Sequence, residues 1–185
     1  MHQMSSQKNR RINKEERETA PTENVEDLDV KILGLLQQDS RLSFNKIAAK
    51  LGISVGTAFN HVKNLEKNGV LKGYTIILDS NKMGYSLTTL IMIQVEGGHL
   101  LDVEDEISRA PNVVAVYDIT GDYDAAVIAK FKDREYLNLF IKNLMRIAHV
   151  KRTVTSVVLD VVKEDLRVNL PEAEEQAKKN QSNRF

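Results

Sequence analysis

The chain has 185 residues with 42% hydrophobic and 28% charged side chains, equal numbers of basic and acidic residues, and no cysteine. This length allows one large domain or two small ones, and the composition is that of a soluble globular protein. The absence of cysteine excludes disulfides, thiolate metal sites and a cysteine nucleophile, and fits an intracellular protein. No run of about 18 apolar residues is present, and the first residues lack the apolar segment of a secretory signal. We therefore expect a cytoplasmic protein without a membrane span.

Residues 1–25 have almost no apolar content and alternate in charge, which predicts a disordered tail. Its basic side chains could touch a DNA backbone, but acidic neighbours largely cancel them. A first helix is predicted from about Glu26 to Gln38, because apolar side chains recur there at helical spacing. These side chains are Leu28, Ile32, Leu35 and Leu36.

The stretch from Phe44 to Leu65 predicts a helix, a tight turn and a second helix. Gly52 supplies the left-handed residue that ends the first helix, and Ser54 is well placed to cap the second. Apolar side chains four and three residues apart give the second helix one buried face, formed by Ala58, Val62 and Leu65. An ordinary helical hairpin with a solvated outer face is the alternative interpretation, because short matches of this kind include many false positives.

The outer face of the second helix is small, polar and able to donate hydrogen bonds, as a helix in a DNA major groove must be. Residues 40–75 carry six basic and one acidic side chain, a net charge of +5, whereas residues 85–170 carry ten and thirteen, a net charge of −3. A basic front and an acidic back are expected when only one part of a protein meets phosphates. We predict that DNA is contacted by Ser54, Thr57, Asn60, His61 and Asn64, with Lys63 and Lys72 on phosphates.

Asn68-Gly69 ends this helix, and the sequence VLKGYTIIL over residues 70–78 predicts a short strand that pairs with a wing or across a dimer. Residues 26–79 therefore form a predicted winged helix-turn-helix DNA-binding domain, followed by a turn-rich linker over residues 80–85. Two recognition helices related by a two-fold axis would read the two half-sites of a palindromic promoter site in double-stranded DNA.

The period of the apolar pattern changes in the second half of the chain. Strands are predicted over Ser86–Glu96, Val113–Thr120, Tyr123–Phe131 and Lys151–Val162, with helices over His99–Ala110 and after a cap at Asp133. This β-α-β-β-α-β order is the ferredoxin-like split arrangement, so an α+β fold is expected with residues 86–169 as the second domain. Residues 170–185 predict a polar C-terminal tail.

Several of the predicted strands are apolar on both faces. In the first of them, Leu90 and Met92 oppose Ile91 and Ile93. A sheet covered by helices on one side only would be polar on the other. We therefore expect the second face to pack on the sheet of a second subunit, so that the protein is a homodimer.

Three motifs follow one another along the chain: LDVKIL at residues 28–33, LEKNGVLKGYTIILD at 65–79 and TGDYDAAV at 120–127. In this combination the sequence from about Val25 to Asn169 resembles the Lrp/AsnC family, the leucine-responsive or feast/famine regulators of bacteria and archaea. The resemblance implies regulation of transcription by an N-terminal winged helix-turn-helix and dimerisation through a ferredoxin-like domain. It also implies frequent assembly to octamers and, in many members, an amino acid bound between dimers.

Two features depart from the family pattern. The recognition helix of many relatives carries arginines where this chain has His61 and Asn64. Asparagine can read adenine edges and histidine can donate to phosphate or base, but fewer fixed charges should lower the non-specific affinity for DNA. The long N-terminal tail is also outside the common pattern.

The loop TGDYD at residues 120–124 is the candidate effector site. Gly121 lets the backbone approach a ligand closely, the two aspartates can pair with an α-ammonium, and exposed N–H groups can take an α-carboxylate. By resemblance, this loop and polar side chains of the last strand, from neighbouring dimers, enclose the amino acid. A simple hairpin turn at Gly121-Asp122 is the alternative. The candidate effector-binding residues are Thr120, Gly121, Asp122, Tyr123, Asp124, Thr153, Thr155 and Ser156.

No catalytic constellation stands out in the sequence, and no cofactor other than the amino acid effector is expected. The histidines show no metal-ligand spacing, and there is no Gly-rich phosphate loop or nucleophile elbow. One enzymatic alternative is a siroheme decarboxylase, which resembles this same fold and would use His99, His149 and Arg152 on substrate carboxylates. A second alternative is an architectural DNA binder that responds to no effector. The basic recognition helix favours DNA over the enzymatic alternative.

Overall fold

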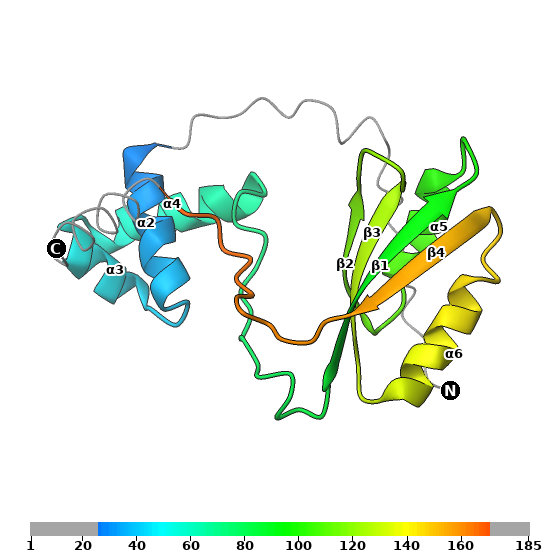
Figure 1. The fold of residues 1–185 in the computed structure, drawn as a ribbon. Helices are drawn as coiled ribbons and strands as arrows, with labels where there is room; N and C mark the ends of the chain where they lie inside the picture. The colour runs from blue at the N-terminus through cyan, green and yellow to red at the C-terminus, as the bar shows by residue number, and fades with distance from the viewer. Residues whose placement is uncertain (1–25, 171–185) are drawn as a thin grey trace, which may run out of the picture. The chain divides into compact units, whose positions relative to one another are not determined.

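The computed structural model describes residues 26–170 (Figure 1). The two predicted tails, residues 1–25 and most of residues 170–185, lie outside the described residues. The described residues form two compact units. The first unit comprises residues 26–75 together with 166–170, and the second comprises Ile76–Asp165. Each unit has its own hydrophobic core and is described by itself.

The first unit contains three helices, α2 (Asp27–Gln38), α3 (Phe44–Leu51) and α4 (Val55–Lys67), at the predicted positions. Their apolar stripes meet in one core, in which Ile32, Ile47 and Ala58 are fully buried. Gly52 ends α3 with a positive φ of 68°, a conformation that glycine adopts without the steric cost of a Cβ atom. Among residues 26–170, no helix is long and apolar enough to cross a membrane.

The predicted strand over residues 70–78 is absent, and this prediction was wrong for the single chain. The segment forms no ladder with any of the residues that the structure describes, and Ile76 and Ile77 are 77% and 85% exposed. A strand exists only when its N–H and C=O groups have a partner strand, and an apolar alternating sequence alone cannot supply that partner.

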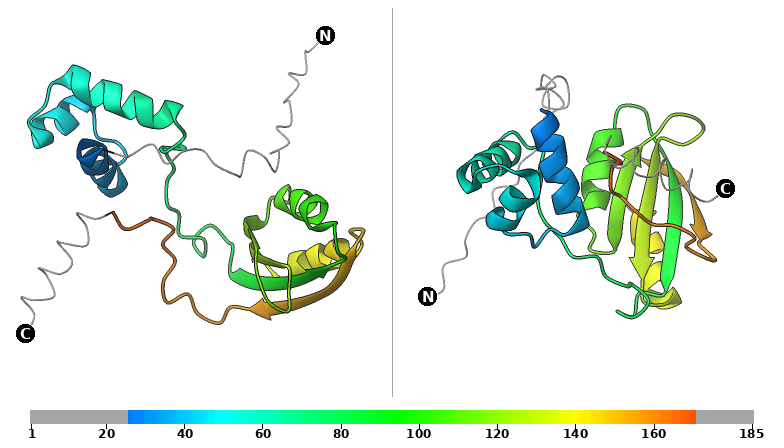
Figure 2. Two further views of the ribbon diagram at one scale, coloured as in Figure 1. Left: turned by 90° about the horizontal axis from the view of Figure 1, so that it is seen from above. Right: turned by 90° about the vertical axis from the view of Figure 1, so that its left-hand side faces the viewer.

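The second unit is a four-stranded antiparallel sheet with the order β2-β3-β1-β4. Its strands are β1 (Leu87–Val95), β2 (Val113–Asp118), β3 (Ala125–Phe131) and β4 (Val150–Val157), and its helices are α5 (Leu100–Ser108) and α6 (Arg134–Leu144). Both helices lie on the same face of the sheet (Figure 2). Element order and strand order together confirm the predicted ferredoxin-like α+β fold.

Strands β1, β2 and β3 begin and end within two residues of their predicted bounds, but β4 ends at Val157 rather than at Val162. The last bond along this edge joins the Val158 N–H to the Thr88 carbonyl oxygen at 2.9 Å. Because β1 begins at Leu87, the chain beyond Val158 has no strand left to pair with, and Leu159 is fully exposed.

The sheet has one face under the helices and one open face. Ile91 and Ile93 point into the helix-covered core, whereas Leu90 pairs with Ile128 and Met92 with Ala126 on the open face. Leu90 is 39% exposed there. The predicted double-sided apolar character is therefore present, and neither α5 nor α6 covers the open face (Figure 2).

A partly buried lysine joins three segments of the second unit. Lys130 in β3 is only 15% exposed, and its Nζ lies 2.6 Å from Glu164 Oε2 and 3.3 Å from Ser80 Oγ. The contact ties the connection before β1 and the chain after β4 to the sheet.

We expect Ile93→Ala to lower the free energy of unfolding of the second unit by about 2–5 kcal/mol, because it leaves a cavity in the centre of the core. Urea unfolding followed by circular dichroism measures this loss. Leu159→Ala is the matched control, since its fully exposed side chain should change stability by less than about 0.5 kcal/mol. Equal effects of the two substitutions would contradict the assignment of the core.

Candidate nucleic-acid interface and effector loop

The N-terminus of α4 is held by a side-chain cap. Ser54 Oγ accepts a hydrogen bond from the Thr57 N–H at 3.0 Å, and the two hydroxyl groups lie 2.8 Å apart. The expected cap at Ser54 is confirmed. Both hydroxyls are therefore engaged with each other at this end of the helix.

The outer face of α4 is exposed and carries Asn60, Lys63, Asn64 and Lys67. Lys63 Nζ lies 2.6 Å from Glu66 Oε2, and this hydrogen bond lowers the pKa of the Glu66 carboxyl. Of the predicted phosphate contacts, Lys63 thus has a partner along its own helix. Lys72 is exposed in the segment after α4. The two asparagines are left as exposed amides that can read base edges.

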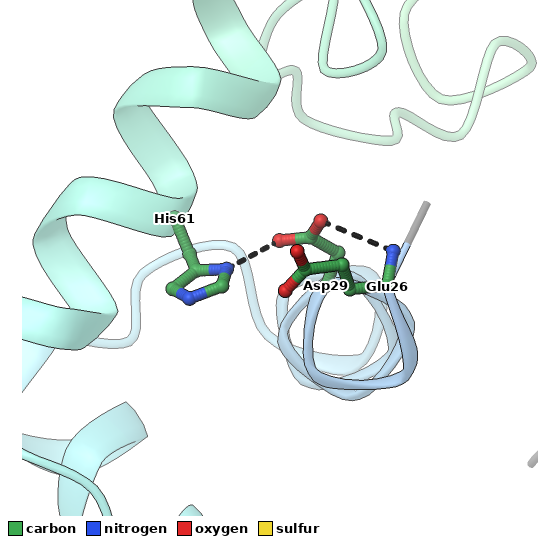
Figure 3. A group of neighbouring side chains, drawn as sticks. All are labelled: Glu26, Asp29 and His61. Carbon is green, nitrogen blue, oxygen red and sulfur yellow. Dashed lines mark hydrogen bonds and ion pairs between the residues drawn. The ribbon is translucent and has the colours of Figure 1, made fainter. Parts of the chain in front are cut away.

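His61 points away from this outer face and toward α2. Its Nδ1 lies 2.7 Å from Asp29 Oδ1, and the two side chains are only 23% and 16% exposed (Figure 3). Asp29 and Glu26 also form the capping box of α2, in which Asp29 Oδ2 accepts from the Glu26 N–H at 3.4 Å. The geometry gives His61 a role in positioning the recognition helix, which the sequence did not reveal.

Two apolar side chains lie beside the polar outer face of α4, and their exposure was not predicted. Val55 is 45% and Phe59 43% exposed. The Phe59 ring packs edge-on against Phe44 of α3, with centroids 5.3 Å apart and planes at 82°. Val55 and Phe59 are four residues apart and lie next to the polar outer face, and this spacing is the sequence signal that could have identified them.

The predicted effector loop connects β2 to β3. Gly121 has a φ of 120°, and a Cβ atom built on it would meet no atom within 4 Å, so its backbone is open to approach. Asp122 is exposed. Asp124 instead serves the fold: its Oδ2 accepts from the Val95 N–H at 2.8 Å, and its own N–H donates to the Ile93 carbonyl at 2.9 Å.

The predicted polar residues of β4 are divided between the two faces of the sheet. Thr153 and Thr155 pair with Ile93 and Ile91 on the helix-covered side, whereas Ser156 pairs with Leu90 on the open side. Thr153 lies in the same cross-strand row as Ala125, which directly follows the effector loop. Of the three, Thr153 is therefore nearest to that loop along the sheet.

Two histidines meet at the end of the sheet that bears this loop. The rings of His99 and His149 are stacked, with centroids 3.5 Å apart and planes at 5°. Glu96 Oε2 lies 3.0 Å from His149 Nδ1, and this bond holds the pKa of Glu96 below its ordinary value. Arg152, the third residue of the enzymatic alternative, pairs with Gln94 in the sheet.

In the part of the chain that the structure describes, three potential metal-ligand side chains come within 4.8 Å of one another in one place, Glu26, Asp29 and His61. The capping box and the imidazole contact already satisfy these groups (Figure 3). The cluster is therefore accounted for as the junction between α2 and α4.

Two known protein families match the chain. Residues 25–72 match winged helix-turn-helix DNA-binding domains. Residues 88–168 match the Lrp/AsnC ligand binding domain. The two matches correspond to the helical unit and to the unit with the four-stranded sheet.

Two relatives match this chain over nearly their whole length. An uncharacterised HTH-type transcriptional regulator of Pyrococcus furiosus is 47% identical over 144 residues, covering 78% of this chain and 97% of that protein. The HTH-type transcriptional regulator FL11 of the same species is 34% identical over 140 residues, which cover 76% of this chain and 93% of that protein.

Solved structures share the fold. A transcriptional regulator from Neisseria meningitidis in complex with L-Met aligns with a TM-score of 0.71 and 22% identity, covering 80% of this chain and 97% of that one. Escherichia coli AsnC aligns with a TM-score of 0.70 and 22% identity, and the alignment covers 79% of this chain and 98% of that one.

The two aspartates of the effector loop should respond differently to removal. We expect Asp124→Ala to lower the free energy of unfolding by about 1–3 kcal/mol, because the buried Val95 N–H loses its acceptor. Asp122→Ala should change it by less than about 0.5 kcal/mol, since this side chain is exposed. Thermal unfolding of both variants checks the difference, and equal stability would refute the anchoring role of Asp124.

Proposed function

The chain belongs to the Lrp/AsnC family of transcriptional regulators, and on this premise we propose that it binds specific DNA sites as a homodimer under the control of an amino acid. The observation that carries the proposal is the two-sided recognition helix α4. One side is buried in the helical core through Ala58 and Val62, and the other presents Asn60 and Asn64 to solvent in a segment of charge +5.

DNA binding follows from the chemistry of that exposed side. Asparagine amides can bond adenine in the major groove, and the lysines of residues 40–75 supply attraction to phosphates. Ser54 and Thr57 lie at the N-terminal end of α4, the end that enters the groove in helix-turn-helix proteins. His61 contributes by holding α4 on α2.

The open face of the sheet supports the proposed dimerisation. Leu90, Met92 and Ile128 form an apolar surface there, and a sheet with an apolar second face requires a cover. The exposed side chains of Ile76 and Ile77, in the segment after α4, likewise suit burial against a second copy. A two-fold dimer presents two copies of α4 to palindromic DNA, and by family resemblance dimers assemble further into octamers.

The effector proposal rests on the loop between β2 and β3. Gly121 leaves its backbone open, and Asp122 is free to pair with an α-ammonium, while Asp124 anchors the loop. The Neisseria meningitidis regulator of the same fold was solved in complex with L-Met, which supports an amino acid as the ligand class. Thr153, on the neighbouring row of the sheet, is a further candidate contact.

A mobility-shift assay on the DNA upstream of the protein's own gene tests the regulatory function. At fixed salt, we expect one of the twenty standard amino acids to change the midpoint or the pattern of the shift. Asp122→Ala should keep DNA binding and lose this response. A shift that no amino acid alters would favour an effector-independent DNA binder. Folded protein that shifts no DNA at low salt would overturn the proposal.

Sedimentation of a variant with a charge on the open face tests the dimer. Met92→Lys should shift the protein toward monomers and weaken DNA binding at least tenfold, because an unpaired ammonium would have to be buried in the interface. Leu139→Lys is the control, since this residue is exposed on α6 and away from the open face. An unchanged sedimentation coefficient for folded Met92→Lys would contradict the proposed interface.

A further inference from the structure

We propose that Phe59 is a specificity-determining residue that contacts the 5-methyl group of a thymine in the major groove. The inference rests on the proposed DNA-binding function and adds a type of contact that the polar face alone does not provide. It starts from an observation on the free protein, an aromatic side chain on the recognition helix that is 43% exposed.

The ring is held in place although it lies outside the core. Phe44 of α3 is partly buried against the helical core, and the Phe59 ring rests edge-on against it at 5.3 Å between centroids. Edge-to-face pairs of this kind are favourable beyond simple burial. Phe59 is thus supported on one side and open to solvent on the other, which is the arrangement of a preorganised contact residue.

The open side of Phe59 adjoins the groups proposed to meet DNA. Phe59 directly precedes Asn60 and lies one turn before Lys63, while the exposed Val55 lies one turn earlier. Gly56 stands between them on the outer side, where a built Cβ atom would approach only Ser54 Oγ, at 3.7 Å. The rim of the helix therefore combines two apolar side chains with a low surface that lets a base edge come close.

Thymine offers the matching chemistry. In the major groove, the other bases present hydrogen-bonding atoms, whereas the thymine methyl is an apolar group that alanine, threonine or phenylalanine side chains can contact. Water covers both the methyl and the exposed part of the Phe59 ring until they meet. With Asn60 beside it as an adenine-reading amide, Phe59 favours half-sites that contain A·T pairs next to each other.

The alternative is that Phe59 serves only to pack α3 against α4. Such a residue would affect stability but would not distinguish thymine from a base without the methyl group. Deoxyuridine differs from thymidine by that methyl alone and keeps the same hydrogen-bonding atoms, so it separates the two roles.

The experiment first selects bound sites from a random duplex library with the full-length protein, and then replaces each thymidine by deoxyuridine in turn. At one position or more in each half-site, we expect wild-type protein to bind the deoxyuridine duplex about fourfold more weakly, the effect of one buried methyl group. Phe59→Ala should bind both duplexes equally, and Phe59→Leu should retain part of the difference.

Asn60→Ala is the matched control, because it should weaken binding to the selected site while keeping the methyl effect. Wild-type protein that is indifferent to deoxyuridine at every position would overturn the proposal without touching DNA binding itself. A methyl effect that persists in Phe59→Ala would do the same. Folded protein that selects no sequence would instead refute the proposed DNA-binding function. The wild-type series is informative even if Phe59→Ala is poorly folded.

Discussion

Burial of one side of α4 is the constraint on which the DNA-binding surface depends. Ala58 and Val62 pack against α2 and α3, and because a helix repeats every ~3.6 residues, this contact fixes the direction of every other side chain on α4. Asn60 and Asn64 face outward as a consequence. The contact between His61 and Asp29, at 2.7 Å, adds a second attachment of α4 to α2 beside the buried stripe. The outward direction of the two amides, on which the proposed reading of DNA depends, is thus a product of packing in the core.

Most of the fold could be predicted from periodicity, and the exceptions have a common cause. Helices α2 to α4 form their backbone hydrogen bonds within each helix, so the spacing of apolar residues was sufficient to predict them. Strands depend on a partner, and the sequence of residues 70–78 could not reveal that residues 26–170 of a single chain contain no strand that pairs with this segment. The same reason explains why β4 ends at Val157, where the start of β1 leaves nothing to pair with.

The candidate site was predictable where it depends on spacing and unpredictable where it depends on distant contacts. Asn60 and Asn64 follow from the helical period alone. His61 and Asp124 have hydrogen-bond partners that lie 32 and 29 residues away in the sequence, and no local sequence pattern indicates such partners. Phe59 was missed for a different reason, because a search for polar groups passes over an aromatic residue that the core leaves exposed.

The junction between α2 and α4 also has a consequence for the chemistry of the imidazole ring. The carboxylate of Asp29 occupies Nδ1, and the other ring nitrogen, Nε2, is directed away from it (Figure 3). Nδ1 is thus committed to the contact that attaches α4 to α2, and only Nε2 is left for any further partner. An arginine at this position would carry a fixed charge and could only donate. The histidine therefore attaches the recognition helix to its neighbour without placing a fixed positive charge on α4.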